Sequence, residues 1–240
     1  MEGHRVFETQ DGTRSLFSER FGVSYHSKYG AWQETQHVFV QAGLRYAAID
    51  RSELSILDIG FGTGLNCVAS ALDPVGRQLT LKYLGVDAYP VDVETLHQLD
   101  YPSALSLGGE DRILFDAIQE LSWQSQSSEQ VFASGNELTF SEVSPNFHLA
   151  KLNARFEVLV EHEAFDVVYY DAFAPSAQPE LWTPERFEAM YRALRPGGIL
   201  VTYCAKGQVK RDLRSVGFDI EALQGPPGKR EMTRAAKPVE

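Results

Sequence analysis

The stretch of sequence that decides the fold is 57–66, which reads LDIGFGTGLN. The apolar run Leu54–Ile59 predicts a buried strand, the glycines that follow predict a tight turn, and Leu65–Leu72 predicts a helix. Glycines after a strand let the backbone approach a ligand closely. The stretch therefore predicts a ligand-binding loop at the carboxyl edge of a parallel sheet.

An acidic residue follows the next predicted strand, Leu79–Val86. This residue, Asp87, lies 23 positions after Gly64, and a carboxylate there suits the two hydroxyls of a ribose. The glycines read G-x-G-x-G, whereas a dinucleotide-binding fingerprint would need a glycine at Leu65. We therefore favour S-adenosylmethionine as the nucleoside. An NAD-linked oxidoreductase and a turn that binds nothing are the alternatives.

Strand and helix patterns alternate along the rest of the chain. Strands are predicted at Glu137–Val143, Phe147–Leu152, Phe165–Tyr170, Ile199–Cys204, Phe218–Leu223 and Arg230–Ala236, and helices at Val91–Leu99, Ile113–Leu121, Pro184–Leu194 and Lys206–Val216. This alternation predicts an α/β fold with a doubly wound, mostly parallel sheet. The GPPG turn at 225–228 joins the last two strands, so the sheet is expected to end in an antiparallel pair.

A small amino-terminal extension, residues 1–50, is expected to pack on this domain, residues 51–240, in a single structural unit. Short strands are predicted at Val6–Thr9 and Ser15–Phe17, and a helix at Ala31–Leu44. The Ser/Gln-rich stretch 122–130 is predicted to be an exposed loop.

Composition and cysteine usage set limits on the class of protein. With 43% hydrophobic and 11% aromatic residues, the chain has enough apolar side chains for a core. No run approaches the ~18 apolar residues of a membrane span, and the polar first residues lack the apolar core of a signal peptide. Two cysteines, Cys67 and Cys204, are too few for a disulfide framework. We expect a reduced, cytoplasmic protein without membrane association.

The charge of the chain is uneven. The net charge is −11, yet residues 205–240 carry a net charge of +3. A basic end on an acidic body can bind phosphates. The alternative is a solvated helix face followed by a charged tail. The candidate phosphate contacts are Lys206, Lys210, Arg211, Lys229 and Arg230.

A second motif, YDAFAPSAQPELW, occupies residues 170–182. Asp171 follows a predicted central strand, in the crevice where such sheets bind ligands. Phe173, Pro175 and Trp182 offer flat apolar surfaces on which a base can stack. The alternative for Asp171 is a helix cap, and that for Trp182 is a core residue.

A third motif, GPPGKREM, occupies residues 225–232. Its adjacent cations, Lys229 and Arg230, are the best candidates for phosphate contact, although the motif also reads as a plain hairpin turn. A triplet of metal-binding residue types at 161–163, Glu-His-Glu, has no second His/Cys cluster to support it, so no metal site is expected.

Together these motifs resemble the S-adenosylmethionine-dependent tRNA wobble-uridine methyltransferases, the family of the MnmC amino-terminal domain and of the stand-alone MnmD enzymes. The resemblance rests on FGTGLN at 61–66, on D-x-F-A-P followed by P-x-x-W at 171–182, and on GKREM at 228–232. The stretch 25–39 is similar to the family's opening segment, Y-x-S followed by E-x-x-x-V-F. The resemblance spans nearly the whole chain.

The resemblance implies a Rossmann-like class I methyltransferase fold and methylation of the aminomethyl group of 5-aminomethyl-(2-thio)uridine at the tRNA wobble position. S-adenosyl-L-methionine would be the cofactor and the tRNA anticodon loop the partner. Since the chain ends at Glu240, the FAD-dependent oxidase half of the bifunctional family members is expected to be absent, with a separate oxidase as a candidate partner. The resemblance does not imply an oligomeric state.

The resemblance also assigns residues to roles. Asp171 would be the catalytic carboxylate beside the reactive amine. The cofactor-binding set would be Gly60, Phe61, Gly62, Thr63, Gly64, Asn66, Asp87, Asn153, Ala154 and Asp171. The substrate-binding set would be Tyr25, Ser27, Glu34, Phe173, Pro175, Trp182, Lys206, Lys229, Arg230 and Glu231. Two positions depart from the family pattern, because Asn153 replaces an acid near the adenine and Ala177-Gln178 replace a Lys-Asn pair.

The methyl group of a sulfonium is already activated, so placement of the nucleophile matters most. With an ordinary pKa of about 4, Asp171 would be a poor base, and we expect it to orient the amine and stabilise the product cation. Two alternative functions stay open. One is aminopropyl transfer, as in spermidine synthases, which show G-G-G-D-G and D-x-x-D-P where this chain has GFGTG and DAFAP. The other is a non-catalytic nucleoside- or RNA-binding module.

Overall fold

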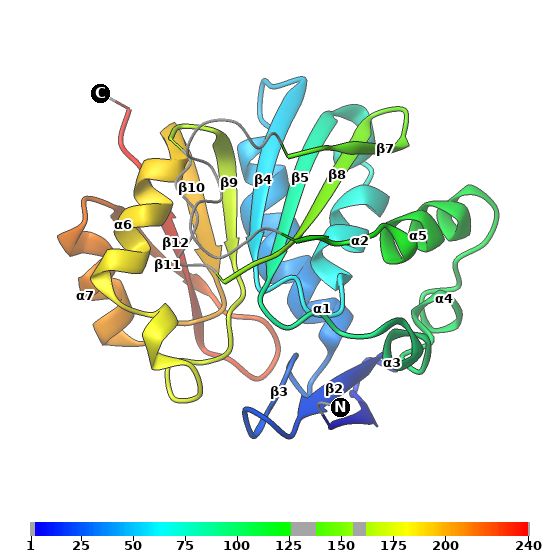
Figure 1. The fold of residues 1–240 in the computed structure, drawn as a ribbon. Helices are drawn as coiled ribbons and strands as arrows, with labels where there is room; N and C mark the ends of the chain where they lie inside the picture. The colour runs from blue at the N-terminus through cyan, green and yellow to red at the C-terminus, as the bar shows by residue number, and fades with distance from the viewer. Residues whose placement is uncertain (1–2, 126–137, 156–161, 240) are drawn as a thin grey trace.

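A central nine-stranded sheet organises the computed structural model, which describes residues 3–125, 138–155 and 162–239 (Figure 1). Along its main path the strand order is β11-β12-β10-β9-β4-β5-β8-β6, and β7 pairs with β8. The strands are β4 Glu53–Ile59, β5 Thr80–Asp87, β6 Gln124–Ser125, β7 Ser141–Ser144, β8 Phe147–Asn153, β9 Phe165–Tyr170, β10 Leu194–Thr202, β11 Asp219–Gln224 and β12 Glu231–Ala236.

The sheet is parallel from β10 to β6, whereas β12 runs antiparallel to both β10 and β11. The predicted doubly wound sheet with an antiparallel end is therefore confirmed. The strands predicted on either side of residues 144–146 pair antiparallel with each other, as β7 and β8. Because β4 lies between β5 and β9, the chain reverses its direction of winding at β4, and the crevice beside such a reversal is where ligands bind.

Alternate residues of the central strands fill two separate cores, as a sheet covered by helices on both faces requires. In β9, Val167 and Tyr169 join the core beneath α2 and α5, while Val168 and Tyr170 join the core beneath α6 and α7 (Figure 1). The helices are α1 Ala31–Thr35, α2 Leu65–Leu72, α3 Val93–His97, α4 Tyr101–Ala104, α5 Glu110–Glu120, α6 Pro184–Ala193 and α7 Gly207–Ser215.

The amino-terminal residues divide between two roles. The strands β1 His4–Glu8, β2 Arg14–Ser18 and β3 Val23–Ser24 form a small antiparallel sheet of their own. Helix α1 instead continues as a π-helix, Gln36–Arg45, which packs on β9, β10 and α2. The part of residues 1–50 that follows β3 thus contributes to the main core.

One boundary differs from the sequence expectation. The predicted helix reaches Leu194 and the next predicted strand begins at Ile199, but α6 ends at Ala193 and β10 already begins at Leu194. The pairing of β10 with β9 shifts register between Leu194 and Ile199, and this bulge accommodates a proline that has no N–H to donate. Residues 126–137 lie outside the described residues, and with them most of the predicted Ser/Gln-rich loop and the first residue of the strand predicted at 137–143. Residue 161, the first of the Glu-His-Glu triplet, also lies outside them.

Three further observations concern membrane spans, metal sites and the two cysteines. None of the helices in the described part of the chain is long and apolar enough to cross a membrane. Within the same residues, no group of three or more His, Cys, Asp or Glu side chains is placed to hold a metal ion. Cys67 and Cys204 are both buried free thiols.

Candidate active site

The loop between β4 and α2 has left-handed backbone at three glycines. Gly60, Gly62 and Gly64 have φ values of 88°, 54° and 76°, which other residues rarely adopt. A Cβ atom on Gly60 would lie 2.7 Å from the backbone oxygen of Asp171, so the loop packs directly against the end of β9. The backbone N–H groups of Gly60 and Phe61 both donate to Val86 O, which ties the loop to the end of β5 as well.

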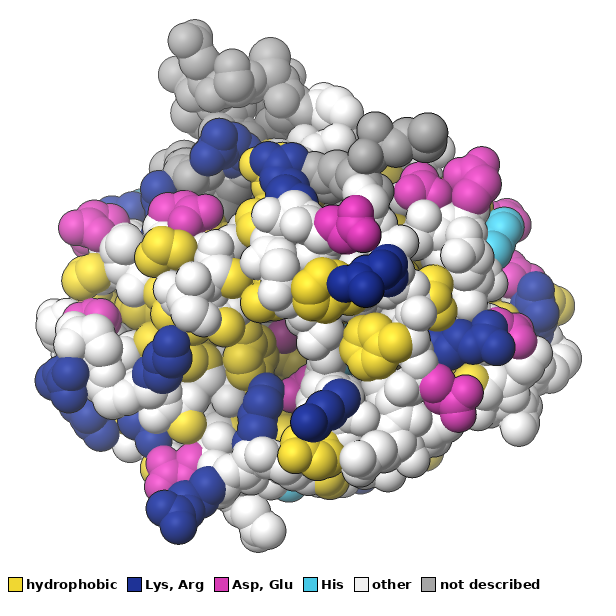
Figure 2. Space-filling view, turned by 90° about the horizontal axis from the view of Figure 1, so that it is seen from below, with side chains coloured by type: hydrophobic (Ala, Val, Ile, Leu, Met, Phe, Trp, Pro, Cys, Tyr) yellow, Lys and Arg dark blue, Asp and Glu magenta, His cyan; other side chains and the backbone are white. Residues whose placement is uncertain are grey.

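A pocket opens beside this loop, at the carboxyl ends of β4, β5 and β9, and encloses about 930 Å³ when space open to solvent is included. In the view from below, hydrophobic side chains surround a hollow with acidic side chains at its floor (Figure 2). The sequence-predicted residues that line the pocket are Tyr25, Gly60, Phe61, Gly62, Thr63, Asn66, Asp87, Ala154, Asp171 and Phe173.

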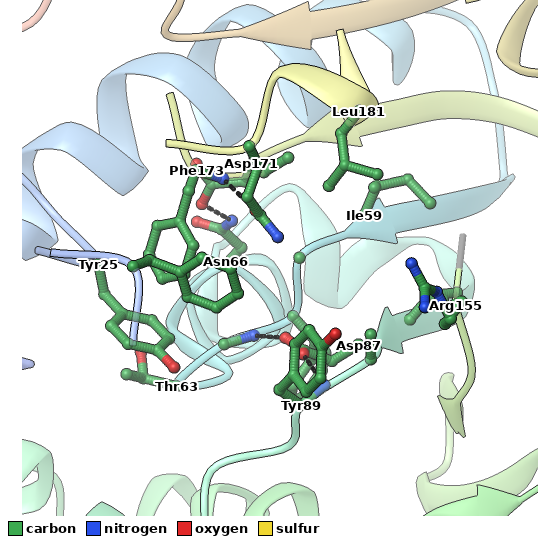
Figure 3. Close-up of a pocket in the computed structure, with 18 of the residues that line it drawn as sticks. Tyr25, Ile59, Thr63, Asn66, Asp87, Tyr89, Arg155, Asp171, Phe173 and Leu181 are labelled. Carbon is green, nitrogen blue, oxygen red and sulfur yellow. Dashed lines mark hydrogen bonds between the residues drawn. The ribbon is translucent and has the colours of Figure 1, made fainter. Parts of the chain in front are cut away.

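Asp87 lies at one end of the pocket (Figure 3). Its two carboxylate oxygens accept hydrogen bonds of 2.8 Å from the backbone N–H groups of Gly62 and Tyr89. These bonds hold the Asp87 carboxylate in place at the pocket wall, and a carboxylate is the kind of acceptor to which ligand hydroxyls donate. Ala154 lines the pocket at the end of β8, whereas Asn153 lies just outside the pocket wall.

Asp171 is held by a chain of side chains behind it. Its Oδ2 accepts a 2.9 Å hydrogen bond from Asn66 Nδ2, and Asn66 Oδ1 accepts one of 3.0 Å from Thr35 Oγ1 (Figure 3). Asn66 is 3% exposed, and its amide is engaged by these two partners. The last residue of the FGTGLN motif therefore orients the Asp171 carboxylate.

The surroundings of Asp171 change its acidity. Burial raises the pKa of its carboxyl well above the ordinary range, and the nearby carboxyls of Asp58 and Glu34 add to this effect. The Asn66 hydrogen bond and the Lys229 charge oppose it without cancelling it. The expectation of an ordinary pKa was wrong, because burial and neighbouring acids cannot be read from the motif. Asp171 is a stronger proton acceptor than an exposed carboxylate.

Asp58, at the end of β4, is a second buried carboxyl group. It is completely buried, and Tyr83 donates a 2.6 Å hydrogen bond to its Oδ2. Burial raises the pKa of Asp58 to about 8.

Comparison with known proteins places the chain in a family. Residues 117–238, half of the chain, match the family described as S-adenosyl-L-methionine-dependent methyltransferase. The chain belongs to this methyltransferase family. The pocket suits S-adenosyl-L-methionine as the cofactor, because the Asp87 carboxylate lies at one end and the glycine loop lines the wall beside it.

The curated relatives of the methyltransferase are longer. A tRNA 5-methylaminomethyl-2-thiouridine biosynthesis bifunctional protein MnmC from Nitrosospira multiformis is 31% identical over 97% of the chain and 37% of the relative. The chain spans about a third of the length of the curated relatives it matches.

Solved structures support the fold of the methyltransferase. MNMC2 of Aquifex aeolicus matches the whole chain and 72% of that protein with a TM-score of 0.71 at 22% identity. A spermidine synthase of Thermotoga maritima matches the whole chain and 71% of that protein with a TM-score of 0.58 at 14% identity. At these identities the likeness concerns the fold alone.

An aromatic row from the amino-terminal sheet crosses the pocket of the methyltransferase. The ring of Phe21 lies 5.0 Å from that of Phe173 and 5.8 Å from that of Tyr89, and Tyr25 meets Phe173 edge-on at 4.9 Å. The Arg20 guanidinium covers Tyr89 at 3.7 Å. Arg20, Phe21 and Tyr89 belong to no motif in the sequence, and only the fold brings the β2–β3 turn against the residues that follow β5.

Lys229 of the methyltransferase forms an ion pair with the buried carboxylate of Glu34. Its Nζ is 2.6 Å from Glu34 Oε1 and 3.9 Å from the centre of the Tyr203 ring. The second oxygen of Glu34 accepts a 2.8 Å hydrogen bond from the Ser27 N–H. Lys229, predicted to contact phosphate, thus already has a carboxylate partner within the chain. Its charge compensates a buried carboxylate and joins α1 to the β11–β12 turn.

Other predicted substrate residues lie apart from the pocket. Trp182 is 6% exposed, packs on Tyr170 and Phe187, and donates from Nε1 to Phe173 O at 2.8 Å, so it is a core residue that supports Phe173. The pocket lining does not include Pro175. The remaining predicted residues are on the surface: Lys206 and Arg230 are exposed, and Glu231 pairs with Lys210 at 2.7 Å.

Replacing Lys229 by methionine is expected to lower the free energy of unfolding by about 2 kcal/mol, because it leaves the Glu34 carboxylate buried without its partner. Urea unfolding at pH 7 measures this loss. The double variant Glu34→Gln/Lys229→Met is the matched control and should recover most of the loss. An equal loss in both variants would mean that the lysine stem, not its charge, stabilises the turn.

Proposed function

We propose that the protein transfers a methyl group from S-adenosyl-L-methionine to the aminomethyl group of 5-aminomethyl-(2-thio)uridine at the tRNA wobble position, giving 5-methylaminomethyl-(2-thio)uridine. The observation that carries this proposal is the Asp171 carboxylate, which burial makes more basic and Asn66 holds beside the glycine loop. An amine seated there finds a proton acceptor next to the cofactor. The MnmC relatives, which are named for the biosynthesis of 5-methylaminomethyl-2-thiouridine in tRNA, support the same reaction.

In this proposal the loop 60–64, with Phe61 and Thr63, lies along the cofactor, and Asp87 accepts hydrogen bonds from the ribose hydroxyls. Ala154 lies beside the adenine, with Asn153 adjacent. When bound, the cofactor supplies an electrophilic methyl group on a sulfonium. The protein has to exclude water from the reacting groups. The contacting rings of Phe21, Phe173 and Tyr25, which line the pocket, can do this.

Asp171 would accept one proton from the substrate ammonium, which frees the nitrogen lone pair for attack. An oxygen of the same carboxyl would then accept a hydrogen bond from the amine N–H, which leaves the lone pair unobstructed and directs it. After methylation the nitrogen is again a cation, and the proton on Asp171 passes to solvent as the product leaves. The Asn66–Thr35 chain keeps the carboxyl from turning during these steps.

The tRNA would approach the face shown in Figure 2, where Lys and Arg side chains surround the hollow. Lys206 and Arg230 are exposed and are our candidates for phosphate contact. The wobble base must leave its stack to reach Asp171, which costs little in an anticodon loop, and Tyr25 and Phe173 offer rings to receive it. An oxidase that uses FAD and releases the free aminomethyl group is our proposed partner, and the cytoplasm the proposed location.

The proposal is tested with methyl-labelled S-adenosyl-L-methionine and tRNA from cells that accumulate 5-aminomethyluridine, followed by digestion and identification of nucleosides. Label on methylaminomethyluridine, and none on tRNA without the aminomethyl group, is the expected result. If the protein binds the cofactor but no tRNA becomes labelled, the proposed substrate is wrong. Aminopropyl transfer would then be tested with the decarboxylated cofactor and free polyamines.

A further inference from the structure

His26 lines the pocket and is not part of the motifs that define the site. It follows β3 and is 8% exposed. Its ring atom Nδ1 lies 3.0 Å from Ser15 Oγ, and its own backbone N–H donates to the same Ser15 Oγ at 3.2 Å. A single hydroxyl of β2 thus contacts both the backbone and the ring of His26.

These two contacts and the burial of Ser15 indicate which ring nitrogen carries the proton. Ser15 is completely buried, its Oγ accepts from the His26 backbone N–H, and within the described residues His26 Nδ1 is the acceptor available to its hydroxyl hydrogen. Nδ1 is then an acceptor, and in a neutral imidazole the hydrogen must lie on Nε2. The ring therefore presents an N–H donor at Nε2, for which no partner is found among the described residues.

The ring is also neutral at physiological pH. Burial lowers the pKa of His26 to about 4, although the charges of Glu34 and Asp11 act in the opposite direction, and the charge of Lys229 adds to the lowering. His26 is therefore a donor without a charge. Such a group hydrogen-bonds an acceptor without attracting phosphate and without repelling an ammonium group.

His26 and Asp171 both line the pocket. His26 directly follows Tyr25, whose ring meets that of Phe173 two residues beyond Asp171, and Figure 3 shows Tyr25, Phe173 and Asp171 on the side of the pocket opposite to Arg155. The Glu34–Lys229 pair influences the pKa of both His26 and Asp171, so the two side chains share one environment.

We propose that His26 Nε2–H donates a hydrogen bond to the carbonyl oxygen at C4 of the pyrimidine whose C5 substituent carries the reactive amine. This inference rests on the proposed function. C4 is bonded to C5. When the amine on the C5 substituent lies against Asp171, the C4 oxygen therefore faces the adjacent part of the pocket wall, to which His26 belongs. A cytosine base has an amino group at C4, and two facing donors leave both unpaired. His26 thus makes the site specific for uridine.

Two substitutions separate this role from a structural one. In His26→Asn the amide oxygen can take the place of Nδ1 and keep the Ser15 bond, but the Nε2 donor is lost. In His26→Gln the amide N–H reaches the place of Nε2, while the Ser15 bond is lost. We expect kcat/KM for tRNA to fall at least tenfold in His26→Asn and less than threefold in His26→Gln, with cofactor affinity unchanged in both.

The decisive measurement compares stem-loops that carry 5-aminomethyluridine or 5-aminomethylcytidine. The wild-type protein should methylate the uridine at least 30-fold faster, and His26→Asn should lose most of this preference. If activity instead follows the urea midpoint and His26→Gln is the poorer enzyme, His26 is structural and the inference is wrong. If the wild-type protein methylates neither stem-loop, the proposed function itself has failed, and the inference falls with it.

Discussion

Replacing Asp171 by asparagine is expected to lower the rate of methyl transfer at pH 7 by about 10²–10⁴-fold, the range typical of a lost general base. The shape of the side chain and the hydrogen bond from Asn66 Nδ2 can both be kept, because an asparagine oxygen can replace Asp171 Oδ2. Cofactor affinity should change by less than threefold. Single-turnover rates and calorimetry with the cofactor measure the two quantities separately.

The pH dependence distinguishes proton acceptance from orientation alone. Without the carboxylate, the variant depends on amine that has already lost its proton in water, and this fraction rises about tenfold per pH unit below the amine pKa. The deficit of Asp171→Asn should therefore shrink as the pH rises from 7 to 9. A deficit that is constant over this range would limit Asp171 to orienting the amine.

The same substitution should stabilise the protein without ligands. Because burial raises the pKa of Asp171 above 3.8, the folded state binds more protons than the unfolded state above that pH. Its contribution to the free energy of unfolding therefore falls as the pH rises from about 4 toward the raised pKa. Asparagine does not titrate, so the unfolding temperature of Asp171→Asn should exceed that of the wild type at pH 8 and approach it at pH 4.

Replacing Gly60 by alanine is expected to weaken cofactor binding at least 100-fold. The φ of 88° costs an L-residue about 1–2 kcal/mol, and the new Cβ would lie 2.7 Å from Asp171 O, so the end of β9 must shift. This shift displaces both the loop and the Asp171 carboxylate, and turnover should fall further than affinity. Calorimetry and single-turnover kinetics check the two effects.

Gly12→Ala is the matched control for strain alone. Gly12 has a similar φ of 81°, but a Cβ atom there would meet nothing within 4 Å. Its variant should lose about 1 kcal/mol of stability and keep its cofactor affinity. If Gly60→Ala binds the cofactor as Gly12→Ala does, the contact between the loop and β9 does not position the site.

Most of the fold could be predicted because its signals are local. The apolar run that forms β4, the glycines after it and the helix α2 are each encoded within a few residues. The carboxyl ends of parallel strands lie at one edge, so placing Asp87 and Asp171 after their strands also predicted that they share a pocket. The start of strand β10 was less predictable, since the strand begins five residues before Ile199 and contains a bulge between Leu194 and Ile199.

The candidate site was predicted in part. The glycine loop, Asp87 and Asp171 follow from their position after strands, whereas the assignment of Trp182 to stacking was wrong because a large aromatic side chain suits a core equally well. Arg20 and Phe21 belong to a turn without a motif, and only the small amino-terminal sheet brings them over the pocket.

By itself, therefore, the sequence determined the order of strands and helices, the glycine loop and the two acids at strand ends, since each depends on neighbouring residues. Only the tertiary structure decided that Asn66 orients Asp171, that Lys229 pairs with Glu34, and that burial raises the pKa of Asp171. The partners in these cases are as many as 195 positions apart. Burial and charge at a site depend on every segment folded around it, and no local pattern records them.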